Sequence, residues 1–206
     1  MKRHDQKIYL GSKSQRRRDL LRQIGVDFEL LLLRDSLPRG PEVDESVFPG
    51  EVADVYVNRV TLDKLACAQR IMIMRKLPSR PILAADTCVV VDAQILGKPD
   101  DQDHARAMLS LLSGRTHQVM TSVAVALHDQ VWQTTQTSSV TFETLTKESI
   151  HAYCAGNEPY DKAGGYGIQG TAALFIREIV GSYSGIMGLP LFETAQLLQQ
   201  AGIRIL

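Results

Sequence analysis

The chain has few cysteines, and those present form no recognisable motif. Cys67, Cys88 and Cys154 are odd in number and widely spaced, without a Cys-x-x-Cys pair. This spacing argues against a disulfide framework and a zinc site, and it is typical of a reducing compartment. No apolar run approaches the roughly 18 residues of a membrane span. The polar start, Met1-Lys-Arg-His-Asp, also lacks the apolar core of a signal peptide. We therefore expect a cytoplasmic protein without membrane contact.

The chain also lacks an excess of either charge, since Lys+Arg and Asp+Glu both number 23. Without an overall basic field we expect no stable nucleic-acid partner, and any anion site must be local. A chain of 206 residues with 44% hydrophobic content can bury a proper core. A chain of this length forms one large domain or two small lobes. We find no repeat and no low-complexity tail, and we expect a single domain over residues 1–206.

Hydrophobic periodicity predicts alternating strands and helices. Strands are expected at 7–10, 28–33, 82–92, 94–96, 117–127, 131–144 and 173–180. After a turn at Gly181-Ser182, a further strand is expected to run through Ile186. Helices are expected at 15–24, at 52–75, between Asp101 and Gly114, at 147–155 and from Pro190. Several hairpins interrupt the alternation, which indicates an α/β fold with a long mixed β-sheet flanked by helices.

Asp86 is the most informative residue, because it falls inside the apolar run Ile82-Leu-Ala-Ala-Asp-Thr-Cys-Val-Val-Val. A run of this kind is typical of a strand covered on both faces. A carboxylate there is costly to bury unless it is paired, hydrogen-bonded or bound to a metal. The strand can alternatively end at Ala85, with Asp86 opening a turn. We see no partner in the sequence that would make Asp86 merely structural.

A basic cluster, Ser12-Lys-Ser-Gln-Arg-Arg-Arg, lies where the first strand meets the first helix. Helix N-termini attract anions, and arginines in the first turn oppose the helix dipole, so an anionic ligand is expected. Serine hydroxyls and guanidinium groups match phosphate oxygens. The alternative is a solvated basic start of a helix.

Further candidates are dispersed along the chain. Lys64 shares a helix face with apolar residues, and Lys98 follows the hairpin that leaves Asp86. The loop 34–50 carries the acids Glu42, Asp44 and Glu45, which are suited to a hard divalent cation. Each of these residues has a simpler interpretation as a solvated charge.

A glycine-rich segment, Asp161-Lys-Ala-Gly-Gly-Tyr-Gly-Ile-Gln-Gly, permits close approach of its backbone to a ligand. It matches neither the Rossmann fingerprint nor the P-loop. The amide of Gln169 has a donor and an acceptor with which to read a base edge. The alternative is a flexible surface loop.

Taken together, these motifs resemble the Maf family of nucleoside triphosphate pyrophosphatases, historically called septum formation inhibitors. The resemblance rests on Leu10-Gly-Ser-Lys-Ser-Gln-Arg-Arg-Arg, Ala85-Asp-Thr-Cys-Val-Val-Val-Asp, Leu96-Gly-Lys-Pro, Leu112-Ser-Gly-Arg-Thr-His, the glycine-rich segment and Met187-Gly-Leu-Pro. The motifs cover nearly the whole chain in order. Thr87 after the Asp, and Gly-Tyr-Gly-Ile-Gln in the loop, resemble the subgroup that hydrolyses dTTP and UTP. Gly11 and Gln15 depart from the usual Ala and Pro.

The resemblance implies a fold with two lobes around a central cleft, similar to Maf and ITPase proteins, and a homodimer. It implies a catalytic base at Asp86 and metal binding by Asp86 and Glu45, with Mg²⁺ or Mn²⁺ as the cofactor. The residues implied to face the substrate phosphates are Ser12, Arg16, Arg17, Lys64 and Lys98. Those implied in base selection are Arg17, Thr87 and Gln169. The competing hypothesis is a non-enzymatic regulator of cell division that binds nucleotide or nucleic acid.

Overall fold

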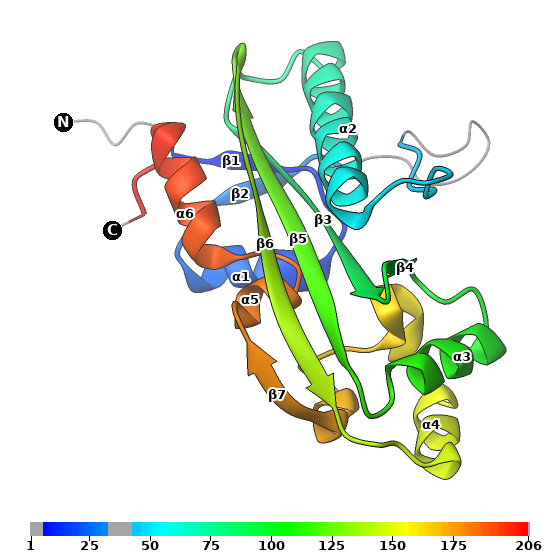
Figure 1. Ribbon diagram of the computed structural model, residues 1–206. Coiled ribbons are helices and arrows are strands. Elements are labelled where there is room, and N and C mark those ends of the chain that lie inside the picture. The colour runs from blue at the N-terminus through cyan, green and yellow to red at the C-terminus, as the bar shows by residue number, and fades with distance from the viewer. Residues whose placement is uncertain (1–5, 33–42, 206) are drawn as a thin grey trace.

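The computed structural model describes residues 6–32 and 43–205. Its strands are β1 Ile8–Leu10, β2 Phe28–Leu30, β3 Ile82–Val91, β4 Gln94–Leu96, β5 Thr116–Leu127, β6 Gln130–Phe142 and β7 Ile176–Val180 (Figure 1). Its helices are α1 Gln15–Gln23, α2 Ala53–Met74, α3 Gln102–Leu112, α4 Lys147–Cys154, α5 Tyr183–Ile186 and α6 Leu191–Gln200. Short 3₁₀ turns occupy Pro159–Asp161, Ala163–Gly165 and Thr171–Phe175.

The strands form a seven-stranded sheet in the order β2-β1-β3-β5-β6-β7, with β4 paired to β3. β1 pairs in parallel with β2 and β3. The other neighbouring strands pair antiparallel, because hairpins join several of them. The predicted α/β fold with a long mixed sheet flanked by helices is confirmed.

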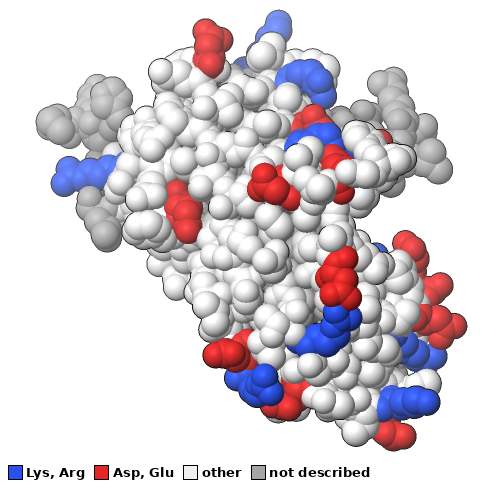
Figure 2. All heavy atoms as spheres, in the orientation of Figure 1, with Lys and Arg blue, Asp and Glu red and all other residues white. Residues whose placement is uncertain are grey.

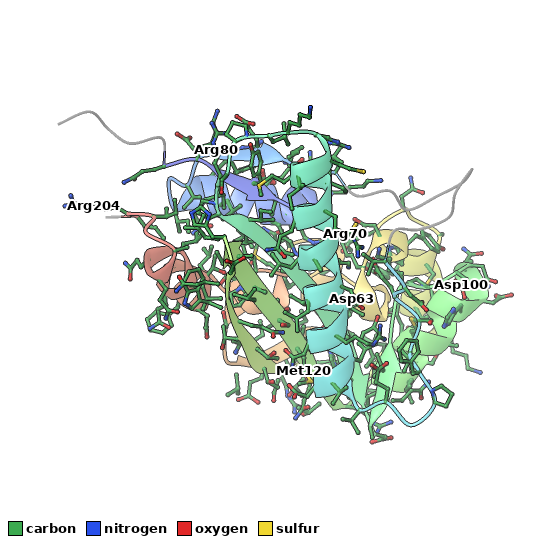
Figure 3. All side chains as sticks on the ribbon, turned by 90° about the horizontal axis from the view of Figure 1, so that it is seen from above. Asp63, Arg70, Arg80, Asp100, Met120 and Arg204 are labelled. Carbon is green, nitrogen blue, oxygen red and sulfur yellow. The ribbon has the colours of Figure 1, made fainter. Side chains whose placement is uncertain are left out.

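Alternation along β3 distributes its side chains between two layers of helices. Ile82, Ala84 and Cys88 pack into the core beneath α2. Leu83 and Ala85 pack into the opposite core, beneath α1 and α6. Figure 3 shows the molecule from above, with α2, which carries Asp63 and Arg70, lying against the strands. By this alternation Asp86 faces α2 and Thr87 faces the other layer.

One edge of β3 changes partner along its length. β1 pairs with it at Ile82 and Leu83, and β4 pairs with it from Val89 to Val91. Between these two contacts, no strand of the described chain pairs with residues 84–88 on this edge. The other edge is continuously paired with β5 from Ile82 to Val90. The sheet therefore opens beside Asp86 and Thr87.

Two predicted strands near the C-terminus need correction. The strand expected from Ala173 starts only at Ile176, because a 3₁₀ turn precedes it. The prediction of a further strand through residue 186 is wrong, because this segment forms the helix α5. Ser182 caps this helix by accepting a hydrogen bond from the Gly185 amide at 3.0 Å. Gly181 makes the turn possible: its φ is 120°, and a Cβ there would lie 2.6 Å from Oγ of Ser138.

We expected no membrane contact and no stable nucleic-acid partner, and the described residues can be compared with both expectations. Within residues 6–32 and 43–205, no helix is both long and apolar enough to cross a membrane. On the face drawn in Figure 2, lysine and arginine side chains lie among aspartate and glutamate side chains and do not form a patch of their own. Residues 34–42 of the predicted loop, with Glu42, and residue 33 of the predicted strand lie outside the described residues.

Candidate active site

A cleft of about 890 Å³ lies at the opening of the sheet beside β3. Its walls come from the start of α1, from α2 and β3, from the loop after β4 and from the glycine-rich segment. The residues to which the resemblance assigned roles line this cleft, namely Ser12, Arg16, Arg17, Glu45, Lys64, Asp86, Thr87, Lys98 and Gln169. Asp44, the other described acid of the predicted loop, is not part of the lining. The convergence of the lining residues from distant segments of the chain makes this cleft the candidate active site.

Asp86 lies in the middle of β3, so the alternative in which the strand ends at Ala85 is wrong. Its side chain is 10% exposed, and Oδ1 accepts a hydrogen bond from the Lys64 ammonium at 2.7 Å. The expectation that Asp86 has no structural partner is therefore also wrong. Lys64 becomes this partner because it lies on the buried face of α2, near Val60 and Ala68, directly over the sheet. The pairing offsets the cost of burying both charges.

Glu45 brings a second carboxylate to the same ammonium, with 2.9 Å between its Oε1 and Nζ of Lys64. Burial by itself would raise the pKa of Glu45. The positive charge and hydrogen bond of Lys64, followed by the charges of Lys98 and Arg17, outweigh burial and hold that pKa below its ordinary value. Two carboxyl groups thus meet at one cation.

The donor set suits Mg²⁺ or Mn²⁺ only if the substrate completes it. Nowhere in the described chain do three or more His, Cys, Asp or Glu residues cluster as a metal site. Mg²⁺, however, is usually held by one or two carboxylates together with substrate phosphates and waters. Asp86 and Glu45, which already share a cation, fit this pattern.

The first turn of α1 forms the basic wall of the cleft. Ser14 caps the helix by accepting a hydrogen bond from the Arg17 amide at 3.4 Å. The Arg17 side chain donates to the Gly188 carbonyl at 2.7 Å, to Oγ of Ser12 at 3.2 Å and to Oγ1 of Thr87 at 3.3 Å. Burial lowers the pKa of Arg17, and the charge of Asp86 opposes this effect. Arg17 therefore joins the helix start to β3 and to the segment before α6.

Thr87 has little hydrogen-bonding capacity left for a base. Oγ1 of Thr121 lies 2.9 Å from its hydroxyl, and Thr121 itself donates to the Gly185 carbonyl at 2.8 Å. The proton between the two threonines must then come from Thr87. Because Thr87 also accepts from Arg17, its direct effect is to hold that guanidinium in place.

Arg16 and Lys98 line the cleft from two separate segments, the first turn of α1 and the loop after β4. Arg16 pairs with Asp161 at 3.2 Å, and this contact ties α1 to the glycine-rich segment. Lys98 is exposed, and its charge reaches Glu45. Sequence analysis gave no role to Asp161, although its place as the acid that begins the glycine-rich segment was the available signal.

Glu158 is a further residue that the sequence analysis missed. Its carboxylate accepts hydrogen bonds from the Thr171 amide at 2.9 Å and from the Tyr153 hydroxyl at 3.0 Å, while Lys162 donates to its backbone carbonyl at 2.6 Å. These contacts close the glycine-rich segment on itself. The segment also needs glycine at Gly164, where φ is 69° and a Cβ would lie 2.9 Å from the Val89 side chain.

Tyr166 anchors this segment to the sheet. Its hydroxyl lies 2.7 Å from Nε2 of His117, and both rings pack edge-to-face against Phe142. Burial lowers the pKa of His117 to about 4, so its ring is neutral near pH 7. Gln169, three residues beyond Tyr166, is exposed at the cleft.

The fold and the cleft define an α/β protein in which two carboxylates and a basic helix start line one cleft. The chain matches the family described as Maf-like protein over residues 7–201, and it belongs to this family.

The relatives are similar along nearly their full length. A protein of Nitrosomonas europaea is 50% identical over 198 residues, which cover 96% of each chain, and one of Aromatoleum aromaticum is 52% identical over 204 residues, or 98% of each. Both are named dTTP/UTP pyrophosphatase. Among solved structures, the Staphylococcus aureus Ham1 protein has a TM-score of 0.41 and 15% identity, covering 66% of this chain and 71% of its own.

Proposed function

We propose that this protein is a nucleoside triphosphate pyrophosphatase that hydrolyses dTTP and UTP to the monophosphate and pyrophosphate. The observation that carries the proposal is the meeting of Asp86, Glu45 and Lys64 beside the basic wall of the same cleft. The names of relatives with about half of their residues identical support the choice of substrates.

In the proposed mechanism Asp86 is the general base. Water adds across the α–β phosphoanhydride, its proton passes to Asp86, and the bond to the leaving pyrophosphate breaks. Phosphoryl transfer depends on positioning and charge neutralisation more than on covalent chemistry. Ser12, Arg16 and Lys98 supply that positioning by holding phosphate oxygens, and Arg17 fixes the wall that carries Ser12.

Asp86 and Glu45 would hold Mg²⁺ or Mn²⁺, which when bound neutralises charge on the triphosphate. Lys64 keeps the two carboxylates together before substrate arrives. Gln169 reads the base through its amide, while Thr87 acts on selectivity through Arg17.

A panel of nucleotides tests the proposal. Each of dTTP, UTP, CTP, dATP and GTP is incubated with Mg²⁺ or Mn²⁺, and phosphate is measured with and without added inorganic pyrophosphatase. We expect phosphate from dTTP and UTP only when the second enzyme is present, since pyrophosphate is the direct product. Phosphate without that enzyme would indicate a phosphatase instead. Nucleotide binding without any product would favour the non-enzymatic regulator.

We further propose that the chain acts as one domain in a cytoplasmic homodimer. Cys88 and Cys154 are buried thiols without a disulfide, which supports a reducing compartment. β5 and β6 each extend between the core under α6 and the core under α3, which supports a single folding unit. Light scattering of the purified protein tests the dimer.

A further inference from the structure

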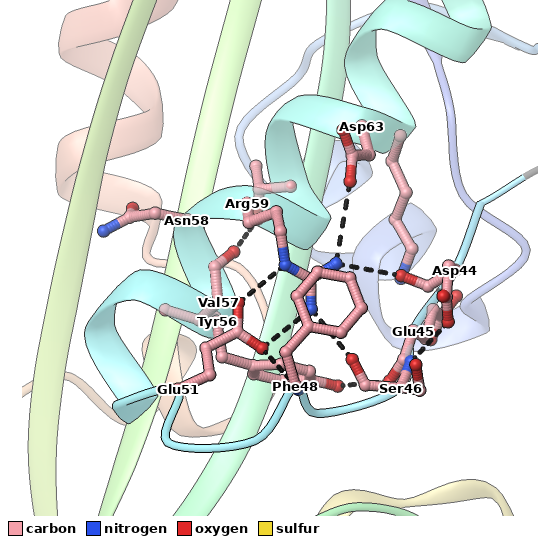
Figure 4. A network of polar contacts seen from close by, with 12 residues as sticks. Asp44, Glu45, Ser46, Phe48, Glu51, Tyr56, Val57, Asn58, Arg59 and Asp63 are labelled. Atoms are coloured by element: carbon pink, nitrogen blue, oxygen red, sulfur yellow. Dashed lines mark hydrogen bonds and ion pairs between the residues drawn. The ribbon is translucent and has the colours of Figure 1, made fainter.

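Arg59 holds the segment that precedes α2. Its Nε lies 2.6 Å from Oε1 of Glu51, and its Nη2 lies 2.9 Å from Oε2 of the same carboxylate. The guanidinium also lies over the Phe48 ring, 4.0 Å from its centroid. Figure 4 shows this bidentate pair. The Arg59 side chain is 20% exposed and that of Glu51 only 5%, so the pair is largely shielded from water.

The same guanidinium binds backbone on both sides of Glu45. Nη1 donates to the Asp44 carbonyl at 3.1 Å, and Nη2 donates to the Ser46 carbonyl at 2.8 Å. The carbonyl of Glu45 itself accepts from the Tyr56 hydroxyl at 3.1 Å. Three consecutive carbonyls are thus fixed by two side chains of α2 (Figure 4).

The side chain of Glu45 depends on this arrangement. Its carboxylate reaches Lys64, which belongs to the same helix as Tyr56 and Arg59. One helix therefore fixes both the backbone and the carboxylate of Glu45, and sets them against Asp86 on β3.

We propose that Arg59 is a positioning residue that holds Glu45 in place as the second carboxylate of the metal site. The inference rests on the proposed function, because Glu45 is a metal ligand only within it. Arg59 is not part of the lining of the cleft, and it acts through Glu45. Lysine cannot substitute, because a single ammonium lacks the planar fork that binds one carboxylate and two carbonyls together.

The test measures Mn²⁺ binding in the presence of an α,β-methylene analogue of dTTP, which the enzyme cannot hydrolyse. Electron paramagnetic resonance of the free Mn²⁺ reports how much metal is bound. Arg59→Lys and Glu45→Gln are compared with the wild type. Arg70→Ala is the matched control, since Arg70 is exposed on the same helix at a distance from the loop (Figure 3). Residues that orient a metal ligand are typically worth about 10- to 100-fold in metal affinity. We expect a loss in that range for Arg59→Lys and none for Arg70→Ala.

The outcomes separate this inference from the proposed function. If Glu45→Gln binds Mn²⁺ as the wild type does, the metal role of Glu45 in the proposed function is wrong. If Glu45→Gln weakens binding and Arg59→Lys does not, the role of Arg59 is wrong. Should Arg59→Lys fail to fold, Tyr56→Phe decides, because it removes only the hydroxyl that holds the Glu45 carbonyl. For Tyr56→Phe, a loss of Mn²⁺ affinity smaller than that expected for Arg59→Lys supports the inference, and unchanged affinity overturns it.

Discussion

Lys64 on α2 donates a hydrogen bond to Asp86 on β3 over 2.7 Å, and this contact joins the helix layer to the open edge of the sheet. The same ammonium holds Glu45 at 2.9 Å. A buried carboxylate without a partner would be destabilising, so the ion pair makes a charged residue tolerable inside β3. It also gathers the groups that the proposed hydrolysis requires.

The first prediction concerns Asp86. Asp86→Asn retains the size of the side chain, and Lys64 keeps Glu45 as a partner, so the fold should persist. Without a base to accept the proton of water, turnover should fall by roughly 10²–10⁴-fold. Steady-state kinetics on dTTP, with circular dichroism as the control for folding, measures this effect. A folded variant that retains most of its turnover contradicts the assignment of the base.

The second prediction concerns the cations that face the phosphates. The Arg16–Asp161 pair is partly exposed, with side chains 30% and 68% accessible. Such pairs are worth only about 0–1 kcal/mol, so substrate phosphate can displace Asp161 from Arg16. Charge-assisted hydrogen bonds contribute about 1.5–3 kcal/mol, and Arg16→Ala or Lys98→Ala should therefore lower kcat/KM by about 10- to 150-fold.

This loss should be equal for all nucleotides, because phosphates carry no information about the base. Asp161→Asn is the matched control, and it should leave kcat/KM close to that of the wild type. A variant of Arg16 or Lys98 that only changes the preferred base would show that these cations contact another part of the ligand.

The third prediction is a dependence of stability on pH through His117. Burial lowers its pKa to about 4 from 6.5, so between these values the unfolded chain binds more protons than the folded one. Stability should therefore fall as the pH falls through this window, by up to about 3 kcal/mol. Urea unfolding at pH 7 and pH 4.5 should show a larger loss for the wild type than for His117→Gln. An equal loss in both proteins would mean that His117 is not the group responsible.

The local pattern of apolar and polar residues was sufficient to predict most of the helices and strands, and also the face of α2 on which Lys64 lies. The Lys64–Asp86 pair was not predicted, because it depends on how α2 docks against β3. Arg59 was missed for another reason: two of its acceptors are the backbone carbonyls of Asp44 and Ser46, which leave no trace in the sequence. Local propensity predicted a strand where the short helix α5 forms. The turn before α5 is set instead by tertiary packing, because the Ser182 amide donates to Ser138 and Gly181 lies against the same residue.

The last prediction concerns the choice of base. Gln169 is exposed at the cleft, on a segment that Tyr166 and Glu158 hold in place. Its amide matches a pyrimidine edge with both a donor and an acceptor. Gln169→Glu replaces the donor by a second acceptor, which opposes the carbonyl oxygens of thymine and uracil.

Sites that hydrogen-bond their substrate discriminate strongly, because the wrong ligand leaves buried groups unpaired. We therefore expect Gln169→Glu to depress kcat/KM for dTTP and UTP far more than for nucleotides with an exocyclic amine. Kinetics on dTTP, UTP, CTP and GTP measures the difference. Gln169→Ala removes both the donor and the acceptor of the amide, and it is the control for loss of contact alone. An equal fall across the four nucleotides would mean that Gln169 shapes the loop without reading the base.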